Sequence, residues 1–331
     1  MAMAFPRMRP SPVRWLAALL LTAGTGAAPT IAHVVSASYA TFTTLGTGGG
    51  PIPHEKRAQP ANLLLSGDQG VLVDVGDGAT EQLGKIGVPM GKVQSIFISH
   101  LHFDHTGGLF AFLSRRFQTA IPGQVTVYGP PGTRATVDSM LAAMAPALAA
   151  WSNIRARNAI SPVDTVKVVE LNDGWTGTVG NITISAASNS HYALQPDAPG
   201  NSKLDTYVFR FDTPGRSITY TGDTGPSDNV ERLAKGVDVL ISEILDPAAL
   251  VAELKRSRPD LSPAVLAVVE EHHRKEHLSP KEVGLMARRA GVKALVLTHN
   301  GIADDGLAAA KSAIAVNYDG PITFANDLQR F

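Results

Sequence analysis

The sequence predicts an α/β domain in which two β-sheets are covered by helices. From Tyr39 onward, short β-rich runs alternate with helical stretches and turn signals. No long linker, repeat or low-complexity tract interrupts this alternation. The 331 residues are 44% hydrophobic, which is ample for a core. Interleaved strands and helices therefore indicate layered sheets and helices in one domain of about 290 residues.

The expected elements follow one another closely along the chain. We expect strands at 39–45, 61–66, 70–75, 94–99, 124–128, 166–170, 182–187, 206–212, 217–221, 238–242, 293–297 and 321–324. We expect helices at 78–86, 107–117, 132–150, 227–235, 263–273, 280–290 and 305–315. The helix at 280–290 is the best marked. Ser279 and Glu282 form a capping box before it, Pro280 occupies its first position, and Gly291 ends it.

The first 37 residues have the pattern of a secretory signal peptide. Three arginines precede the apolar run 15–23, and small residues follow it. The run is shorter than the roughly 20 residues needed to span a bilayer. Cleavage could follow Ala27, Ala32 or Ala37, and the last of these would leave residues 38–331 as the mature domain in the periplasm or medium. A disordered N-terminal extension is the alternative.

Composition limits the chemistry and the partners. The chain has no Cys, which excludes disulfides, thiolate metal sites and a Cys nucleophile. Residues 1–37 carry three Arg and no acidic residue, so their removal leaves 26 basic and 29 acidic residues, a net charge of −3. An acidic mature chain lacks the basic surface expected of a nucleic-acid binder. We therefore expect no nucleic-acid partner.

The segment 100–105 carries the strongest chemical signal. His100, His102, Asp104 and His105 directly follow the apolar run 94–99. Unpaired imidazoles and carboxylates are costly to bury, so packing alone does not explain the cluster. Imidazole and carboxylate together suit zinc, and the four side chains are enough to begin two metal sites.

Three more residues sit at the ends of β-like runs, namely His191, Asp223 and His299. Taken singly, each is ordinary: a surface histidine or a turn aspartate. Strand ends, however, are where functional loops gather in layered α/β proteins. The seven side chains therefore predict two metal sites. One is held by His100, His102 and His191, the other by Asp104, His105 and His299, with Asp223 as the bridge.

With these residues the chain resembles the metallo-β-lactamase superfamily, whose signature His-x-His-x-Asp-His stands here at 100–105. The resemblance implies an αββα sandwich, two mixed β-sheets flanked by helices, with two zinc ions at the sheet edge. Manganese or iron suits the same donors. Four further segments resemble the branch that contains tRNase Z and the related arylsulfatases: 45–51 with Arg57, 72–83, 220–224, and 241–243 together with 277–279. True β-lactamases lack the bridging carboxylate.

The resemblance also implies the catalytic residues. Besides Asp104, these are His277 as proton donor and Glu243 as the residue that orients it. The predicted start of the helix at 280–290 lies just beyond His277 and can fix its direction. A solvated position in the polar run 270–277 is the alternative, and His272 and His273 are interpreted as parts of that charged helix end. Asp74 is expected to orient a ligand histidine.

The lengths of two connections in the chain depart from the tRNase Z pattern. Only 32 residues separate His191 from Asp223, too few for the arm with which tRNase Z clamps tRNA. Instead, 132–160 contains an apolar helical segment at 140–151. It is interpreted as a lid over an apolar pocket, as the surface of a homodimer, or as an ordinary core helix.

These observations predict an exported dizinc hydrolase without a stable membrane anchor. A hydroxide shared by the two metals would cleave small-molecule esters, either phosphate diesters or aryl sulfates. A lactonase or β-lactam hydrolase would use the same hydroxide on a carbonyl carbon. A non-catalytic binding protein is the remaining alternative, and the complete set of ligands argues against it.

Overall fold

The computed structural model describes residues 40–150, 161–194 and 205–331. These residues belong to one unit, which spans Ala37–Phe331. The predicted signal peptide at 1–37 and the end of the predicted insertion at 151–160 lie outside the described residues. Within the described part of the chain, no helix is both long and apolar enough to cross a membrane.

The first sheet has seven strands in the order β14-β1-β2-β3-β4-β5-β6. Its strands are β1 (Thr41–Gly46), β2 (Ala61–Ser66), β3 (Gln69–Val75), β4 (Val93–Phe97), β5 (Val125–Gly129), β6 (Val166–Glu170) and β14 (Gln329–Arg330). The pairs from β14 to β3 are antiparallel, and those from β3 to β6 are parallel. Helical crossovers make the parallel part possible.

The second sheet repeats this design in the order β13-β12-β11-β10-β9-β8-β7. Its strands are β7 (Thr176–Val179), β8 (Ile182–Ser188), β9 (Tyr207–Thr213), β10 (Arg216–Tyr220), β11 (Val239–Ile244), β12 (Leu295–Asn300) and β13 (Ile322–Phe324). Strands β7 to β10 pair antiparallel, and β10 to β13 pair parallel. Both sheets are therefore mixed, as predicted.

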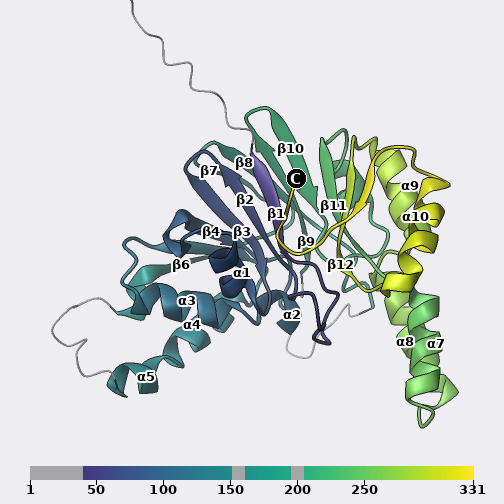
Figure 1. Ribbon diagram of the computed structural model, residues 1–331. Helices are drawn as coiled ribbons and strands as arrows, with labels where there is room; N and C mark the ends of the chain where they lie inside the picture. Colours follow the sequence, from purple (N-terminus) through teal and green to yellow (C-terminus); the bar gives the residue numbers. More distant parts are fainter. Residues whose placement is uncertain (1–39, 151–160, 195–204) are drawn as a thin grey trace, which may run out of the picture. The chain divides into compact units, whose positions relative to one another are not determined.

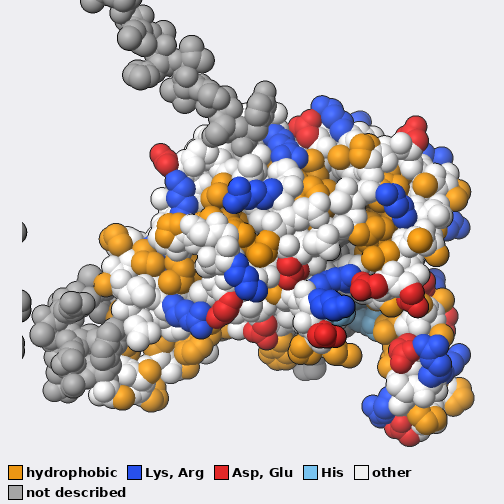
Figure 2. Space-filling model, in the orientation of Figure 1, with side chains coloured by type: hydrophobic (Ala, Val, Ile, Leu, Met, Phe, Trp, Pro, Cys, Tyr) orange, Lys and Arg blue, Asp and Glu red, His pale blue; other side chains and the backbone are white. Residues whose placement is uncertain are grey.

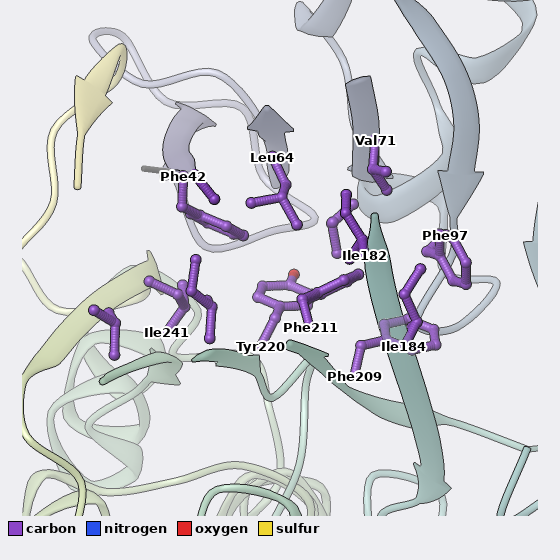
Figure 3. Packing of buried hydrophobic residues seen from close by; sticks show 14 of the residues in the cluster. Phe42, Leu64, Val71, Phe97, Ile182, Ile184, Phe209, Phe211, Tyr220 and Ile241 are labelled. Atoms are coloured by element: carbon purple, nitrogen blue, oxygen red, sulfur yellow. The ribbon is translucent and has the colours of Figure 1, made fainter. Parts of the chain in front are cut away.

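One apolar core lies between the two sheets. Phe42, Leu64 and Phe97 from the first sheet meet Phe209 and other apolar side chains from the second (Figure 3). The rings of Phe97 and Phe209 lie edge to face with their centroids 5.5 Å apart, the favoured geometry for aromatic pairs. This packing sets the spacing of the sheets whose ends carry the candidate site.

Helices cover the outer faces of both sheets (Figure 1). The first sheet is covered by α1 (Ala79–Lys85), α3 (Leu109–Gln118) and α4 (Thr133–Ala142), and the second by α6 (Asp228–Leu233), α9 (Pro280–Ala290) and α10 (Leu307–Ala315). The remaining helices are α2 (Phe103–Thr106), α5 (Ala145–Ala150), α7 (Pro247–Ser257) and α8 (Pro263–Glu276). The layers confirm the predicted αββα sandwich.

Local signals explain the best-predicted helix and one that the prediction missed. Helix α9 has the expected capping box, in which the Glu282 side chain accepts a hydrogen bond from the Ser279 amide at 2.9 Å. Helix α7 was not predicted, although Asp246 caps it by accepting a hydrogen bond from the Ala249 amide and Pro247 is its first residue.

The predicted helix at 132–150 is in fact two helices, because α4 ends at Ala142 and α5 begins at Ala145. Val137, Leu141 and Met144 pack into the core beneath the first sheet. In contrast, α5 has no buried residue. The described half of the insertion is therefore partly an ordinary core helix.

Candidate metal centre

The predicted metal-binding residues come together where strands of the two sheets end. His100 and His102 follow β4, and His191 follows β8. Asp223 follows β10, and His299 is the penultimate residue of β12. The fold thus gathers residues that are up to 199 positions apart in the sequence. Their position at strand ends predicts this, because functional loops gather there.

The first group consists of His100, His102 and His191, whose donor atoms lie within 4.8 Å of one another. His102 Nδ1 is 3.0 Å from His100 Nε2 and 3.2 Å from His191 Nε2. Ligand nitrogens about 2.0–2.1 Å from one zinc ion stand about 3.3 Å apart in a tetrahedral site. The spacing of the three imidazoles therefore fits a single divalent metal.

The second group consists of Asp104, His105, Asp223 and His299, again with donor atoms within 4.8 Å of one another. Asp223 Oδ1 is 3.3 Å from His105 Nε2, and Asp223 Oδ2 is 3.3 Å from His299 Nε2. The same Oδ2 atom is 3.9 Å from His100 Nε2 in the first group. Asp223 therefore lies between the two groups, where a bridging carboxylate is expected.

A buried carboxylate, Asp74 on β3, holds residues of both groups. Its Oδ2 atom accepts hydrogen bonds from His105 Nδ1 at 2.8 Å and from the Ser99 hydroxyl at 2.8 Å. The Ser99 oxygen lies 3.1 Å from His100 Nδ1 and can accept its proton. These bonds leave Nε2 of both histidines directed at the site, the arrangement that a carboxylate behind a metal ligand produces. This is the role expected for Asp74.

Two buried atoms of the cluster make no hydrogen bond. His105 Nε2 and Asp223 Oδ1 are buried without a hydrogen bond, and a buried polar atom left unpaired is costly. Burial opposes ionisation of Asp223, but His299 and His105 hold its pKa well below the ordinary value. Burial also opposes a charge on His105, yet Asp223 and Asp74 raise its pKa well above the usual range. The cluster thus favours a cation, and the donor set fits divalent metal.

The backbone at the site is strained at two residues. Asp74 and His299 both adopt positive φ angles, 56° and 42°. Such conformations are uncommon outside glycine and persist where the surroundings hold them, often at functional sites. In both residues the side chain belongs to the cluster.

His277 and Glu243 form the predicted pair beside the metal groups. His277 Nδ1 donates a hydrogen bond to Glu243 Oε2 at 2.7 Å, and Glu243 Oε1 accepts one from the Thr224 amide at 2.5 Å. Burial opposes a charged imidazole, but the neighbouring Glu243 raises the pKa of His277 to about 9. Glu243 therefore fixes the ring of His277, and a donor atom of His277 lies within 4.8 Å of donor atoms of His191 and Asp223.

A cavity of about 290 Å³ opens onto both metal groups and onto His277. Its lining residues are Gly50, Pro51, His102, Phe103, Asp104, Asp223, His272, His273, His277 and His299. Figure 2 shows histidine side chains in a recess beside the α7–α8 pair, whose outer end carries charges of both signs. No described residue of the 133–150 segment lines this cavity, so the lid interpretation finds no support there.

Several residues at the site were missed or misassigned from the sequence. His272 and His273 line the cavity instead of only ending a charged helix. Glu276 is buried, and its backbone oxygen accepts a hydrogen bond from His191 Nδ1 at 2.9 Å. A helical period would have found His272 and Glu276, which lie four residues apart on one face of α8.

The fold and the clustered donors define a metal-dependent hydrolase. A family model described as "Beta-lactamase superfamily domain" matches residues 70–300, and the chain belongs to the metallo-β-lactamase superfamily.

Within the superfamily, its relatives identify the tRNase Z-like branch. The protein named Ribonuclease Z from Mycobacterium marinum (strain ATCC BAA-535 / M) is 31% identical over 298 residues, which cover 87% of this chain and 97% of the relative. Ribonuclease Z from Mycobacterium bovis (strain BCG / Pasteur 1173P2) is 29% identical over 294 residues, covering 87% and 96%.

Solved structures show the same fold. The metallo-β-lactamase fold protein YhfI from Bacillus subtilis has a TM-score of 0.63 and 20% identity, covering 88% of this chain and 98% of that one. The short form of human tRNase Z has a TM-score of 0.58 and 20% identity, with the same coverage.

The relatives correct the prediction about substrate. A small phosphodiester or aryl sulfate ester, with no nucleic-acid partner, was expected from the net charge and the missing arm, and this is wrong because the relatives are named Ribonuclease Z. Net charge averages over the whole surface and does not report the surface near the site. The short connection between His191 and Asp223 was also a poor guide, since the similarity covers almost the whole relative.

Proposed function

We propose that this protein is a metal-dependent endoribonuclease that hydrolyses a phosphodiester bond in an RNA precursor. The observation that carries the proposal is the position of His277, which is held by Glu243 and shares one cavity with Asp104, Asp223 and His299. A phosphodiester has a leaving alkoxide that needs a proton and charged oxygens that need a cation, and this cavity offers groups for both. The names of the relatives supply the RNA substrate class.

Two zinc ions are the cofactors that we propose. His100, His102 and His191 would hold one ion, and Asp104, His105 and His299 the other, with Asp223 between them. When bound, the ions would supply Lewis acidity at the phosphate and make hydroxide available near neutral pH. Manganese and iron suit the same nitrogen and oxygen donors.

The side chains of the protein supply the proton transfers. Burial opposes ionisation of Asp104, but the hydrogen bond from His299 and the nearby His105 keep its pKa below the ordinary value. Asp104 is therefore a carboxylate that can accept a proton from water in the cavity. His277 would donate a proton to the leaving oxygen from Nε2, while Glu243 holds its Nδ1.

The test is cleavage of a 3′-extended tRNA precursor by the full chain loaded with zinc. The expected products are two RNA fragments from a single cut, with no cleavage after chelation. His277→Ala should lower kcat by about 10²- to 10⁴-fold with the metal content unchanged. Asp223→Ala should instead lose about one metal equivalent by elemental analysis.

His54→Ala is the matched control, because His54 bonds to the Gly49 carbonyl and does not line the cavity of the metal groups. It should cleave like the wild type. Full metal loading without cleavage of any RNA would refute the proposed function. Loss of metal in His277→Ala would show that this residue is a ligand and that its proposed role is wrong.

A further inference from the structure

Phe103 is the most exposed large apolar side chain in the described part of the chain, at 87%. It stands inside the metal motif, between His102 and Asp104. An apolar ring left in water gains nothing for folding, because apolar side chains stabilise the fold through their burial. Phe103 also takes no part in the three apolar clusters of the described residues. The fold therefore does not explain the ring.

The position of Phe103 is nevertheless fixed. It is the first residue of α2, and the Gly107 amide donates a hydrogen bond to its carbonyl oxygen at 2.6 Å. The carbonyl of His102 accepts hydrogen bonds from the His105 amide at 3.1 Å and the Thr106 hydroxyl at 3.0 Å. Hydrogen bonds within the metal motif thus fix the backbone of Phe103, although its ring is exposed.

Phe103 also lines the same cavity as Asp223 and His277. Pro51 lines this cavity too, and the neighbouring Ile52 is 76% exposed. The polar groups that would act on a phosphate therefore lie beside an apolar rim. A nucleotide bound with its phosphate at the metal groups would bring the flat face of a base within reach of that rim.

We propose that Phe103 is a substrate-binding residue that stacks on a nucleobase next to the scissile phosphate. This inference rests on the proposed function and names the part of the RNA that the site recognises. Stacking on an aromatic side chain tolerates any base, because every base has a π-face. The contribution of one such contact, about 1–3 kcal/mol, corresponds to a change of roughly 5- to 140-fold in kcat/KM at 1.4 kcal/mol per tenfold.

The experiment compares three forms of one 3′-extended tRNA precursor: intact, and with an abasic residue on either side of the scissile bond. The wild type should cleave one of the two abasic forms roughly 5- to 140-fold less efficiently than the intact form. Phe103→Ala should cleave the intact form with the same deficit and should no longer distinguish it from that abasic form. Phe103→Tyr should retain both the rate and the discrimination.

Folding and metal content provide the controls. Because the ring is exposed, Phe103→Ala should match the wild type in thermal unfolding and metal equivalents. Phe110→Ala, at a Phe on α3 that does not line the cavity, should cleave all three substrates like the wild type.

Two results would overturn the role of Phe103 and leave the proposed function standing. One is wild-type cleavage of the intact RNA by Phe103→Ala. The other is a wild type that cleaves both abasic forms as well as the intact one. A metal-loaded wild type that cleaves no RNA would instead refute the proposed function, and the assignment would fall with it.

Discussion

Replacing Asp74 with Asn tests whether one carboxylate holds both metal groups. Asp74 Oδ2 accepts three hydrogen bonds, from His105, the Ser99 hydroxyl and Tyr220, the last at 2.7 Å, and Oδ1 accepts one from the Ser99 amide at 2.7 Å. Asn is the informative substitution because it retains the shape and tolerates the positive φ of 56° at this position.

The magnitude follows from the count of donors. Asn keeps one oxygen, and if that oxygen takes the place of Oδ2, its amide faces the Ser99 amide. Two buried donors then lack acceptors, each at a cost of about 1–3 kcal/mol, so the free energy of unfolding should fall by at least about 2 kcal/mol. Loss of a carboxylate behind a metal ligand weakens metal affinity by about 10- to 100-fold.

The assay has two arms, urea unfolding of the metal-free protein and competition for zinc with a coloured chelator. Asp74→Asn should lower both the stability and the zinc affinity. The affinity should fall for both metal equivalents, because Asp74 contacts His105 directly and His100 through Ser99. Asp68→Asn, at an exposed carboxylate paired with Lys92, should change neither. A variant with reduced stability but unchanged zinc affinity would refute the reasoning.

Three more predictions follow from particular contacts. Gly50→Ala should lose metal and about 1–3 kcal/mol of stability, because a β-carbon there would lie 1.9 Å from Asp104 Oδ2. Elemental analysis measures the metal content, and urea unfolding measures the stability. Gly84→Ala is the control, because open space surrounds that position. Chelation should lower Tm by about 5–10 °C if free metal stood about 100-fold above Kd, and an unchanged Tm in calorimetry would contradict metal binding. The hydrogen bond from Lys293 lowers the pKa of Asp238 to about 2, so Asp238 stabilises the fold above its unfolded pKa of about 3.9 and loses this effect as pH falls toward 2. Asp238→Asn should therefore cost under about 1 kcal/mol at pH 7 and less as pH falls through 2, and an equal loss of stability at pH 7 and at pH 2 would show that the charge is irrelevant.

The layers of the fold were predictable because each strand is a short apolar run closed by a turn signal. The gathering of His100, His191 and His299 was predictable for a related reason, since each follows or ends such a run. The contact between Tyr220 and Asp74 was not predictable, because the two residues are 146 positions apart and lie on different sheets. Only the packed sandwich brings them together.

Two expectations from the sequence have different outcomes. The substrate prediction failed because net charge and loop length describe the whole chain, whereas recognition depends on a few residues around one cavity. Export of the chain and removal of residues 1–37 stay predictions. N-terminal sequencing of the protein recovered from its own cells would test them, and an intact Met1 would refute them.

The hydrogen bond from Tyr220 to Asp74 joins the two sheets at the metal centre. Tyr220 ends β10 of the second sheet, while Asp74 lies on β3 of the first. Any sliding of one sheet over the other would therefore displace the donors, and metal binding would in turn favour the aligned sandwich. By thermodynamic reciprocity, a substitution that loosens the packing of Phe209, which does not line the cavity, should weaken metal affinity by as much as metal stabilises the tighter packing.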